Sequence, residues 1–567
     1  MATTVPILPQ TGGGFLLHST SPAEIFTPED LTAEHRAIAR TTAEFFEKEV
    51  APHLEAIQHH EPGLAKSIVR KSAALGLTAI VIPEAYGGLE MDLISAMVAS
   101  EQLARDGSYA GWHGAHTSIG TLPLLLFGNE EQKQRYLPKL ASAEMLAAYC
   151  LSEPHAGSDA LNIRTRADLA PDGQHYLLNG QKMWITNGGA ADLYTVFAKI
   201  GGEQFSAFLV ERAWPGVKPG NEEKKMGIKG SSTTPVYFEN VRVPKENLLG
   251  EIGKGHLIAF NILNFGRFKL GSGCTGGAKT ILAESLKYAK ERTAFGKPIA
   301  EFGMIRHKLA EMAVRIYAAE SVTYRVAGLL SGSGAGLQMK AAEEFAAECS
   351  YVKVLASEML DYVADEGVQI HGGYGYHQDY LVERAYRDSR INRIFEGTNE
   401  INRMLATGML LKRAQKGRLP LVEAVKQLQN EILSGTAAKD DAVHNAKQIA
   451  LFTLGVAYQR FLNDLESQQE ILAALTDISM NAFAIETCLL RAKKLPAAEP
   501  YAAVFQDGAM QMIESSARAI LAASSEGDAL RTNLAILRRF AKLDPVNTVQ
   551  LRRQIAQRQL DAGRYTL

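Results

Sequence analysis

The sequence predicts a mainly α-helical protein with a central antiparallel β domain. Apolar residues recur at helical intervals on both sides of a region rich in short β-type runs and turn dipeptides. The chain has 567 residues, well beyond the ~250–300 at which a single hydrophobic core stops growing. We therefore expect four domains: an N-terminal helical domain (1–145), a β-barrel domain (146–255), a helical bundle (256–412) and an extra C-terminal helical domain (413–567).

Composition limits the classes of partner and compartment. With 46% apolar and 22% charged residues the chain is typical of globular proteins, and a net charge of -2 without long single-sign blocks does not favour nucleic acid as a partner. The four cysteines show no CxxC spacing, which is typical of reduced thiols in a reducing compartment. No basic leader, Arg-rich transit pattern or apolar run of ~20 residues is present, so we expect a cytoplasmic, bacterial-type location.

The N-terminal region is predicted to be helical after a short arm. Residues 1–20 are rich in Thr, Pro and Gly and are expected to form a loose arm. Capping residues Thr27-Pro28-Glu29-Asp30 then open an amphipathic pattern that runs to Pro52. Further helices are predicted over 64–75, 91–105, 115–127 and 130–141.

The pattern changes at about residue 147. Short runs rich in aromatic and β-branched residues follow, separated by Asp-Gly, Asn-Gly and Gly-Gly turns, which predicts a small antiparallel domain, with a barrel favoured. The predicted strands cover 176–178, 182–186, 194–198, 207–210 and 236–238.

Helical periodicity returns after Gly255 and predicts a bundle with segments near 256–270, 277–292, 303–330, 337–366 and 379–388. The region after Arg413 is again helical. Its first apolar stripe could lie on an anionic membrane surface, because several lysines and arginines are nearby, or it could pack against the bundle or a partner subunit. We favour packing for this stripe, which consists of Leu421, Val425, Leu428 and Ile432.

A turn near the end of the bundle carries the candidate catalytic carboxylate. Glu396 is followed by Gly-Thr-Asn, residues that fit poorly in a helix interior and favour caps and turns. Partial burial beside Phe395 would raise the pKa of this carboxyl toward that of a useful base. Taken alone, a solvated loop glutamate would be the commoner explanation.

Three other chemistries are disfavoured. Residues 271–276 match the GxGxxG pattern, but they lie in a helical context without the following strand of a dinucleotide site, so close helix packing is the favoured use. His371 and His377 have no acidic or cysteine partner at ligand spacing, and we expect no metal site. No GxSxG elbow supports a serine nucleophile.

Two segments could contact a planar cofactor. Residues 149–159 form a strand that enters a loop of hydroxyl and glycine residues, where backbone N–H groups could bind a polar ring edge or a phosphate. Trp184 and Thr186 end a later strand, where an indole can pack on a ring and a hydroxyl can bond its edge. Each segment alone is equally compatible with an ordinary turn or a core tryptophan.

Taken together, five ordered motifs resemble the acyl-CoA dehydrogenase family of flavoproteins over roughly residues 30–412. The C-terminal helices make the very-long-chain subgroup the most similar. The resemblance implies an FAD cofactor and an acyl-CoA thioester clamped by a helical domain, a β-barrel and a helical bundle. The motifs lie at Tyr149–Asp159, Trp184–Gly189, Arg292–Gly296, Gln369–Tyr376 and Phe395–Glu400.

The resemblance also implies roles for individual residues. Glu396 would remove the α-proton while hydride passes from the β-carbon to the flavin, giving the trans-2-enoyl-CoA. The implied flavin contacts are Tyr149, Leu151, Ser152, Gly157, Ser158, Trp184, Thr186, Thr398 and Glu400, together with Arg292 and Phe295 of one subunit and Gln369, Gly372 and Gly373 of its neighbour. The implied substrate contacts are Ser158, Asn264, Arg267 and Gly397.

We therefore expect dehydrogenation of medium-to-long acyl-CoA in fatty-acid β-oxidation by a homodimer or dimer of dimers, with electrons passed to an electron-transfer flavoprotein. Some members of the family place the base where this chain has Gly266, which cannot serve, so Glu396 is favoured. Chain length stays open, because residues 108–114 mix small residues with Tyr109 and Trp112. The alternatives are an acyl-CoA oxidase and a non-catalytic acyl-CoA-binding or assembly protein.

Overall fold

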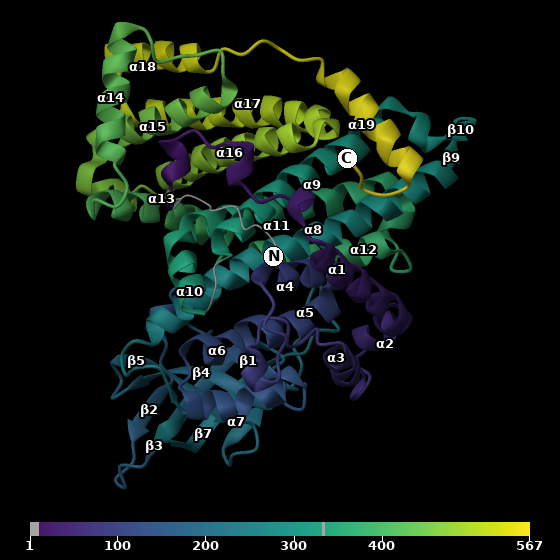
Figure 1. The fold of residues 1–567 in the computed structure, drawn as a ribbon, viewed down its shortest axis with the longest axis vertical. Coiled ribbons are helices and arrows are strands. Elements are labelled where there is room, and N and C mark those ends of the chain that lie inside the picture. Colours follow the sequence, from purple (N-terminus) through teal and green to yellow (C-terminus); the bar gives the residue numbers. More distant parts are fainter. Residues whose placement is uncertain (1–10, 332–334) are drawn as a thin grey trace.

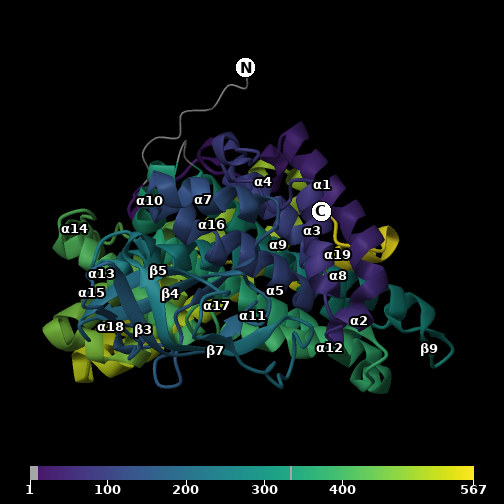
Figure 2. The same cartoon turned by 90° about the horizontal axis from the view of Figure 1, so that it is seen from below.

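The computed structural model describes residues 11–331 and 335–567, with side chains described from 339 onward in the second range. Figure 1 shows the sheet and the N-terminal helices at one end, the long helices α8, α9 and α11 across the middle, and the C-terminal helices at the other end. Figure 2, viewed from below, shows the sheet beside the N-terminal helices. The long helices thus contact both ends of the molecule.

The N-terminal helices lie mostly where they were predicted. The expected helix over 115–127 is instead interrupted by a wide π-type turn at His116–Gly120, and a helix that the sequence did not indicate precedes it. The helices are α1 (Ala33–Phe45), α2 (Leu54–Gln58), α3 (Leu64–Ala74), α4 (Leu93–Leu103), α5 (Gly107–Ala115), α6 (Leu122–Phe127) and α7 (Glu130–Ala141).

The prediction of a loose arm is wrong for residues 11–20, the part of the arm that the structure describes. Phe15 and Leu16 are buried in the main hydrophobic core. The backbone N–H of Gly13 donates to Glu348 at 2.7 Å, and the N–H of Gly12 donates to Glu344 at 2.8 Å. Two apolar side chains and two charge-assisted hydrogen bonds therefore fix this segment on the bundle.

The sheet is mixed rather than purely antiparallel. β1 and β2 each pair with β4 in parallel, whereas the remaining pairings are antiparallel. The order β6-β7-β3-β2-β4-β5-β8 is open, since β6 and β8 do not pair within the described chain. The strands are β1 (Ala147–Cys150), β2 (Arg166–Leu169), β3 (His175–Thr186), β4 (Leu193–Ile200), β5 (Gln204–Glu211), β6 (Val217–Pro219), β7 (Thr233–Pro244) and β8 (Leu248–Leu249).

Helix α8 (Gly255–Glu291) is continuous, although two separate segments were predicted. Its glycines allow close approach of neighbouring helices. A Cβ at Gly276 would lie 2.0 Å from the backbone oxygen of Glu101, and one at Gly271 would lie 2.2 Å from Val352. The GxGxxG pattern is thus a packing surface, as predicted.

The remaining bundle elements surround α8. They are β9 (Thr293–Ala294), β10 (Lys297–Pro298), α9 (Gly303–Leu330), α10 (Ala335–Glu344), α11 (Ala346–His371), α12 (Leu381–Ser389) and α13 (Asn399–Gln415). The C-terminal helices are α14 (Leu421–Ser434), α15 (Ala442–Phe461), α16 (Gln469–Lys494), α17 (Glu499–Ser524), α18 (Gly527–Phe540) and α19 (Thr548–Ala562).

The apolar stripe of α14 packs inside the molecule, as favoured. Leu421 and Leu428 are buried, and a Cβ at Gly455 of α15 would lie 2.7 Å from Val425. α16 is long and apolar enough to cross a membrane, but 83% of its apolar window is buried inside the protein. Neither helix therefore supports membrane contact.

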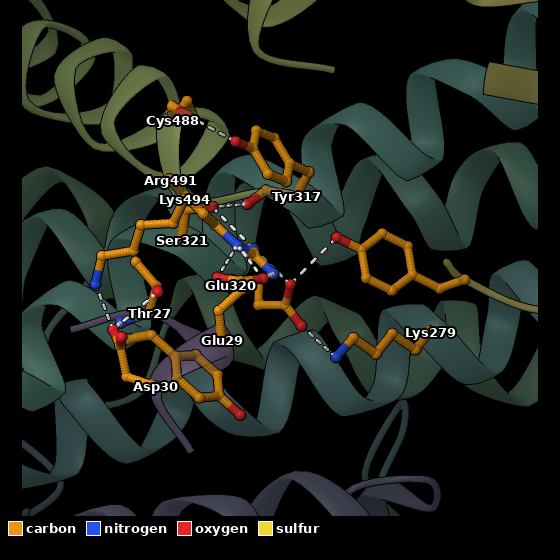
Figure 3. Close-up of polar contacts among 12 residues, drawn as sticks. Thr27, Glu29, Asp30, Lys279, Tyr317, Glu320, Ser321, Cys488, Arg491 and Lys494 are labelled. Carbon is orange, nitrogen blue, oxygen red and sulfur yellow. Dashed lines mark hydrogen bonds and ion pairs between the residues drawn. The ribbon is translucent and has the colours of Figure 1, made fainter. Parts of the chain in front are cut away.

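A buried ion network joins the two ends of the molecule (Figure 3). Arg491 of α16 pairs with Glu320 of α9 at 2.6 Å and with Glu29 of the N-terminal region at 3.0 Å. Lys279 of α8 also pairs with Glu320 and, at 2.5 Å, with Glu101 of α4. The network links the N-terminal helices, the bundle and the C-terminal helices in one interior site.

Candidate active site

A cavity of about 230 Å³ lies between α5, α8 and the segment from α12 to the start of α13. Glu396 lines it on one side, and Thr186, at the end of β3, also reaches it. Small residues dominate its helical walls: Gly107, Ala110, Gly111 and Gly114 from α5, and Gly266, Gly273 and Gly277 from α8.

Glu396 lies on a turn immediately before α13, as predicted. Its φ of 57° and the φ of 78° at Gly397 are left-handed, and a left-handed glutamate is a strained conformation held by its surroundings. Arg267 Nε donates to the Glu396 carbonyl at 3.2 Å, and Asn402 Nδ2 donates to the Gly397 carbonyl at 2.8 Å. Thr398 caps α13 by accepting the N–H of Ile401 at 3.2 Å. The backbone of the turn is thus fixed at Glu396 and at the two residues that follow it.

The Glu396 carboxyl is poised to exchange a proton near neutral pH. Its Oε2 atom is buried and, among the described residues, has no hydrogen-bond partner. Burial raises the pKa of Glu396 to about 7, although the charges of Arg267 and Lys353 act in the opposite direction. A carboxylate with such a pKa is a competent general base at pH 7.

The pKa of Glu396 predicts a pH profile. Since only the carboxylate accepts a proton, kcat/KM should rise with pH through a midpoint of about 7 rather than near the ordinary glutamate value of 4.5. Removing the Lys353 cation by Lys353→Met should move the midpoint upward, because that cation lowers the pKa. A wild-type profile that is flat from pH ~8 down to pH ~5 would contradict the assignment.

Gly266 makes room for this carboxyl. A Cβ at Gly266 would lie only 2.5 Å from Glu396 Oε2, so a larger residue would displace it. Next to Gly266, Arg267 Nη1 donates to Asn264 Oδ1 at 2.8 Å, and Asn264 Nδ2 donates to the Ala342 carbonyl at 3.0 Å. The structure therefore gathers Asn264, Arg267 and Gly397 around the turn, whereas Ser158 lies on a separate exposed loop.

An ion pair between Glu153 and Lys182, which the sequence did not reveal, fixes the segment that follows β1. Glu153 accepts hydrogen bonds from the backbone N–H groups of Arg164 and Thr165 at 2.6 and 3.1 Å. It also pairs at 2.7 Å with the fully buried Lys182. Lys182 in turn donates to the carbonyl of Leu151 at 3.1 Å. This pair supports the segment that contains the predicted flavin contacts: Tyr149, Leu151, Ser152, Gly157 and Ser158.

The indole of Trp184, near the end of β3, is exposed on the surface of the sheet domain. The pairing of β3 with β7 is irregular between Lys182 and Ile185, and Trp184 has a left-handed φ of 57°. Its side chain is therefore turned outward and is 59% exposed, an unusual state for an indole. Beyond Thr186, Asn187 donates to the Trp112 carbonyl at 2.9 Å and ties the strand to α5.

A second hollow gathers the other predicted cofactor residues. Arg292, Gly372 and Gly373 line it within one chain, and the Arg292 guanidinium lies 5.8 Å from the Tyr374 ring centre. The expected division of the flavin contacts between one subunit and its neighbour stays a prediction. Gln369 lies just before the turn, and Phe295 is 95% exposed nearby on the β9–β10 connection.

A buried lysine that the sequence did not indicate contacts the start of α13, next to the Glu396 turn. Lys353 is fully buried on α11, and its Nζ lies 2.5 Å from Asn399 Oδ1. Asn399 Nδ2 donates to Ser357 and Glu358 at 3.1 and 3.0 Å. Glu400, predicted to close the site, is exposed. Lysine is so often exposed that only the helical phase of Lys353 among apolar neighbours could have signalled its burial.

The aromatic residues of α5 do not block the cavity. Tyr109 is fully buried on the other face of the helix, beside Phe45, and Trp112 Nε1 donates to the Gly230 carbonyl at 2.8 Å. Glycine and alanine occupy the cavity-facing positions, spaced three or four residues apart. Of the two possibilities that the sequence left open, plugging of this cavity by Tyr109 or Trp112 is therefore not seen.

Comparisons with known proteins agree with this geometry. Models of the N-terminal, middle and C-terminal domains of acyl-CoA dehydrogenases match residues 32–144, 148–241 and 253–410, and another acyl-CoA dehydrogenase C-terminal domain model matches 445–539. A "probable acyl-CoA dehydrogenase" of Bacillus subtilis (strain 168) is 47% identical over 98% of this chain and 99% of its own length.

Two further relatives extend the comparison. The human very long-chain specific acyl-CoA dehydrogenase is 44% identical over 58% of this chain and 51% of its own length. The crystal structure of an acyl-CoA dehydrogenase complexed with FAD from Bacillus anthracis has a TM-score of 0.96, 46% identity, and coverage of 98% of this chain and 100% of that one. These similarities span the sheet, both helical ends and the cavity, and the chain belongs to the acyl-CoA dehydrogenase family.

Proposed function

We propose that the protein is an FAD-dependent dehydrogenase that converts medium-to-long acyl-CoA thioesters to trans-2-enoyl-CoA. The observation that carries this proposal is Glu396, whose buried Oε2 has no hydrogen-bond partner in the described chain and which lines a cavity walled by small residues. The FAD complex of the Bacillus anthracis relative supports the cofactor.

The chain's own residues account for proton removal. Glu396 would take a proton from C2 of the acyl chain, an acid far too weak for a carboxylate unless the thioester carbonyl is polarised. No described group accepts the backbone N–H of Glu396, which leaves that donor free for the thioester oxygen. Arg267 holds the carbonyl of the same residue and so fixes the turn.

The residues around the sheet fit a flavin. The exposed Trp184 indole offers a flat apolar face, and Thr186 lies at the boundary between the strand and the cavity. The loop after β1 offers backbone and hydroxyl donors that are held by the Glu153–Lys182 pair. When bound there, FAD would supply the acceptor for the hydride that leaves C3.

The cavity wall formed by α5 bears on the length of acyl chain that the protein accepts. A Cβ at Gly114 would meet no atom within 4 Å, so this wall is open toward the cavity. We expect Gly114→Leu to lower kcat/KM for palmitoyl-CoA at least ~10-fold relative to octanoyl-CoA, because the new side chain occupies space needed by the longer chain. Gly114→Ala is the matched control and should change the ratio little. An unchanged ratio in Gly114→Leu would contradict this placement of the acyl chain.

The reaction is tested by turnover with palmitoyl-CoA and octanoyl-CoA in the presence of a dye acceptor, with identification of the product. Formation of the trans-2-enoyl-CoA is expected, together with slow reoxidation of the reduced flavin by air. Rapid reoxidation with hydrogen peroxide formation would indicate an acyl-CoA oxidase instead. Flavin that is bound but never reduced by any acyl-CoA would favour a non-catalytic binding protein.

We further propose a homodimer, or a dimer of such dimers, that passes electrons to an electron-transfer flavoprotein in fatty-acid β-oxidation. Phe295 and Tyr376, 95% and 86% exposed, flank the hollow of Arg292 and the Gly372–Gly373 turn. Large exposed aromatics beside a cofactor-type hollow are typical of a subunit interface. Light scattering of Phe295→Asp is the test, and a dimer mass unchanged by this charge would contradict the interface.

A further inference from the structure

One cation of the cavity wall has no role in the proposed reaction and no carboxylate partner in the described chain. Lys269 of α8 lines the cavity one helical turn beyond Gly266, the residue that faces the Glu396 carboxyl. Its Nζ lies 3.2 Å from the hydroxyl of Thr117, and among the described residues this is its one hydrogen-bond partner. An ammonium has three N–H donors, so two remain for something inside the cavity.

The other cations of the cavity wall are each paired with a carboxylate of the chain. Arg105 pairs with Glu47 at 2.6 Å, and Arg384 pairs with Asp106 at 3.7 Å. The remaining lining aspartate, Asp388, accepts the backbone N–H of Ile228. In contrast, no carboxylate of the described chain lies within 4.0 Å of Lys269.

A second unsatisfied polar group lines the same cavity. Ser118 adjoins Thr117 in the π-type turn, lines the same cavity and is only 5% exposed. Its Oγ is buried with no partner in the described chain. An ammonium without a counter-ion in a cavity wall and a buried hydroxyl without a partner are both costly, and the cost falls when a ligand oxygen binds them.

We propose that Lys269 and Ser118 form a subsite for a carboxylate carried by the acyl chain, so that the enzyme also accepts thioesters of dicarboxylic acids. This proposal rests on the dehydrogenase function above. A carboxylate satisfies both groups at once, since it accepts from the ammonium and from the hydroxyl.

The same subsite is compatible with apolar chains. The four-carbon stem of Lys269 presents apolar surface to the cavity, while its ammonium stays on the Thr117 hydroxyl. Thr117 itself donates to the His113 carbonyl at 2.9 Å, so its oxygen is oriented to accept. An unsubstituted acyl chain can therefore pass along this apolar stem, away from the ammonium.

The test compares two substrates of equal carbon number, suberoyl-CoA and octanoyl-CoA, on the FAD-loaded protein. Wild type should oxidise both. Lys269→Met keeps the apolar stem and removes the charge, and it should lower the suberoyl-to-octanoyl ratio of kcat/KM about 10- to 100-fold, the range for a lost hydrogen bond to a charged group. Ser118→Ala should lower the ratio less, and Lys287→Met on the exposed face of α8 should leave it at the wild-type value.

Four results would overturn the subsite. Wild type that oxidises octanoyl-CoA but not suberoyl-CoA would leave the dehydrogenase function intact and remove this inference alone. An equal loss on both substrates in Lys269→Met, with a shifted flavin reduction potential, would show that the ammonium serves the flavin. If Lys269→Met does not fold, an unchanged suberoyl-to-octanoyl ratio of kcat/KM in Ser118→Ala would itself overturn the subsite. Wild type that oxidises neither substrate would overturn both proposals.

Discussion

Replacing Glu396 by glutamine is expected to lower kcat about 10²–10⁴-fold, the range in which a positioned general base contributes to catalysis. Glutamine has nearly the same shape and cannot accept the α-proton. The cavity beside Gly266 should accommodate it, because the amide replaces a carboxyl oxygen that already lacks a partner. FAD content and acyl-CoA binding should therefore be retained. The measurement is steady-state turnover of the FAD-loaded variant with palmitoyl-CoA and a dye acceptor.

The matched control for this variant is Glu131→Gln, an exposed glutamate at the start of α7. It should retain wild-type turnover. Retained turnover in Glu396→Gln would show that another group removes the proton. Loss of bound FAD in Glu396→Gln would instead show that the glutamate supports the cofactor site.

Replacing Arg491 by methionine is expected to give the largest loss of stability. The guanidinium is buried between Glu320 and Glu29, and its removal leaves buried carboxylates without their counter-charge (Figure 3). Breaking a buried ion pair from one side costs about 3–5 kcal/mol of unfolding free energy. Urea denaturation followed by circular dichroism, with limited proteolysis of the C-terminal helices, should show an earlier transition.

The control for Arg491→Met is Arg518→Met on α17. Arg518 pairs with Glu514 at 2.6 Å on the exposed side of its helix, and such pairs contribute only about 0.3–0.5 kcal/mol.

The network also predicts a pH dependence of stability. Although burial raises the pKa of Glu320, the charges of Lys279 and Arg491 outweigh this effect and hold the pKa below the usual value. The stabilisation by the network should therefore be present above pH 4.5 and be lost as the pH falls. Equal free energies of unfolding for Arg491→Met and Arg518→Met would contradict a stabilising role of the interior network.

Local sequence patterns predicted the elements whose signals are local. The helix over 303–330 and the turn at Glu396 lie where periodicity and residue preference placed them. Residues 271–276 were left outside the predicted helical segments, although close helix packing was the favoured use of their glycines. Glycine is costly in a helix interior, and packing against Glu101 and Val352 outweighs that cost. Which residues these glycines contact is not visible in the local sequence.

Features that depend on distant partners could not be predicted. The parallel pairings of β1 and β2 with β4 join strands separated by other segments, so strand runs alone indicate no direction. The buried lysines Lys182 and Lys353 have partners far away in the chain, and a lysine in isolation is predicted to be exposed. The roles of the site residues stay predictions that the variants above test.

The most direct test of the central claim is the rate at which palmitoyl-CoA reduces the bound flavin in a single anaerobic turnover, measured with hydrogen and with deuterium at C2. If Glu396 removes the C2 proton in the step that reduces the flavin, the deuterated substrate should react several-fold more slowly in wild type. Glu396→Gln should show almost no reduction with either substrate. Equal rates for the two substrates, together with normal reduction in Glu396→Gln, would contradict the account.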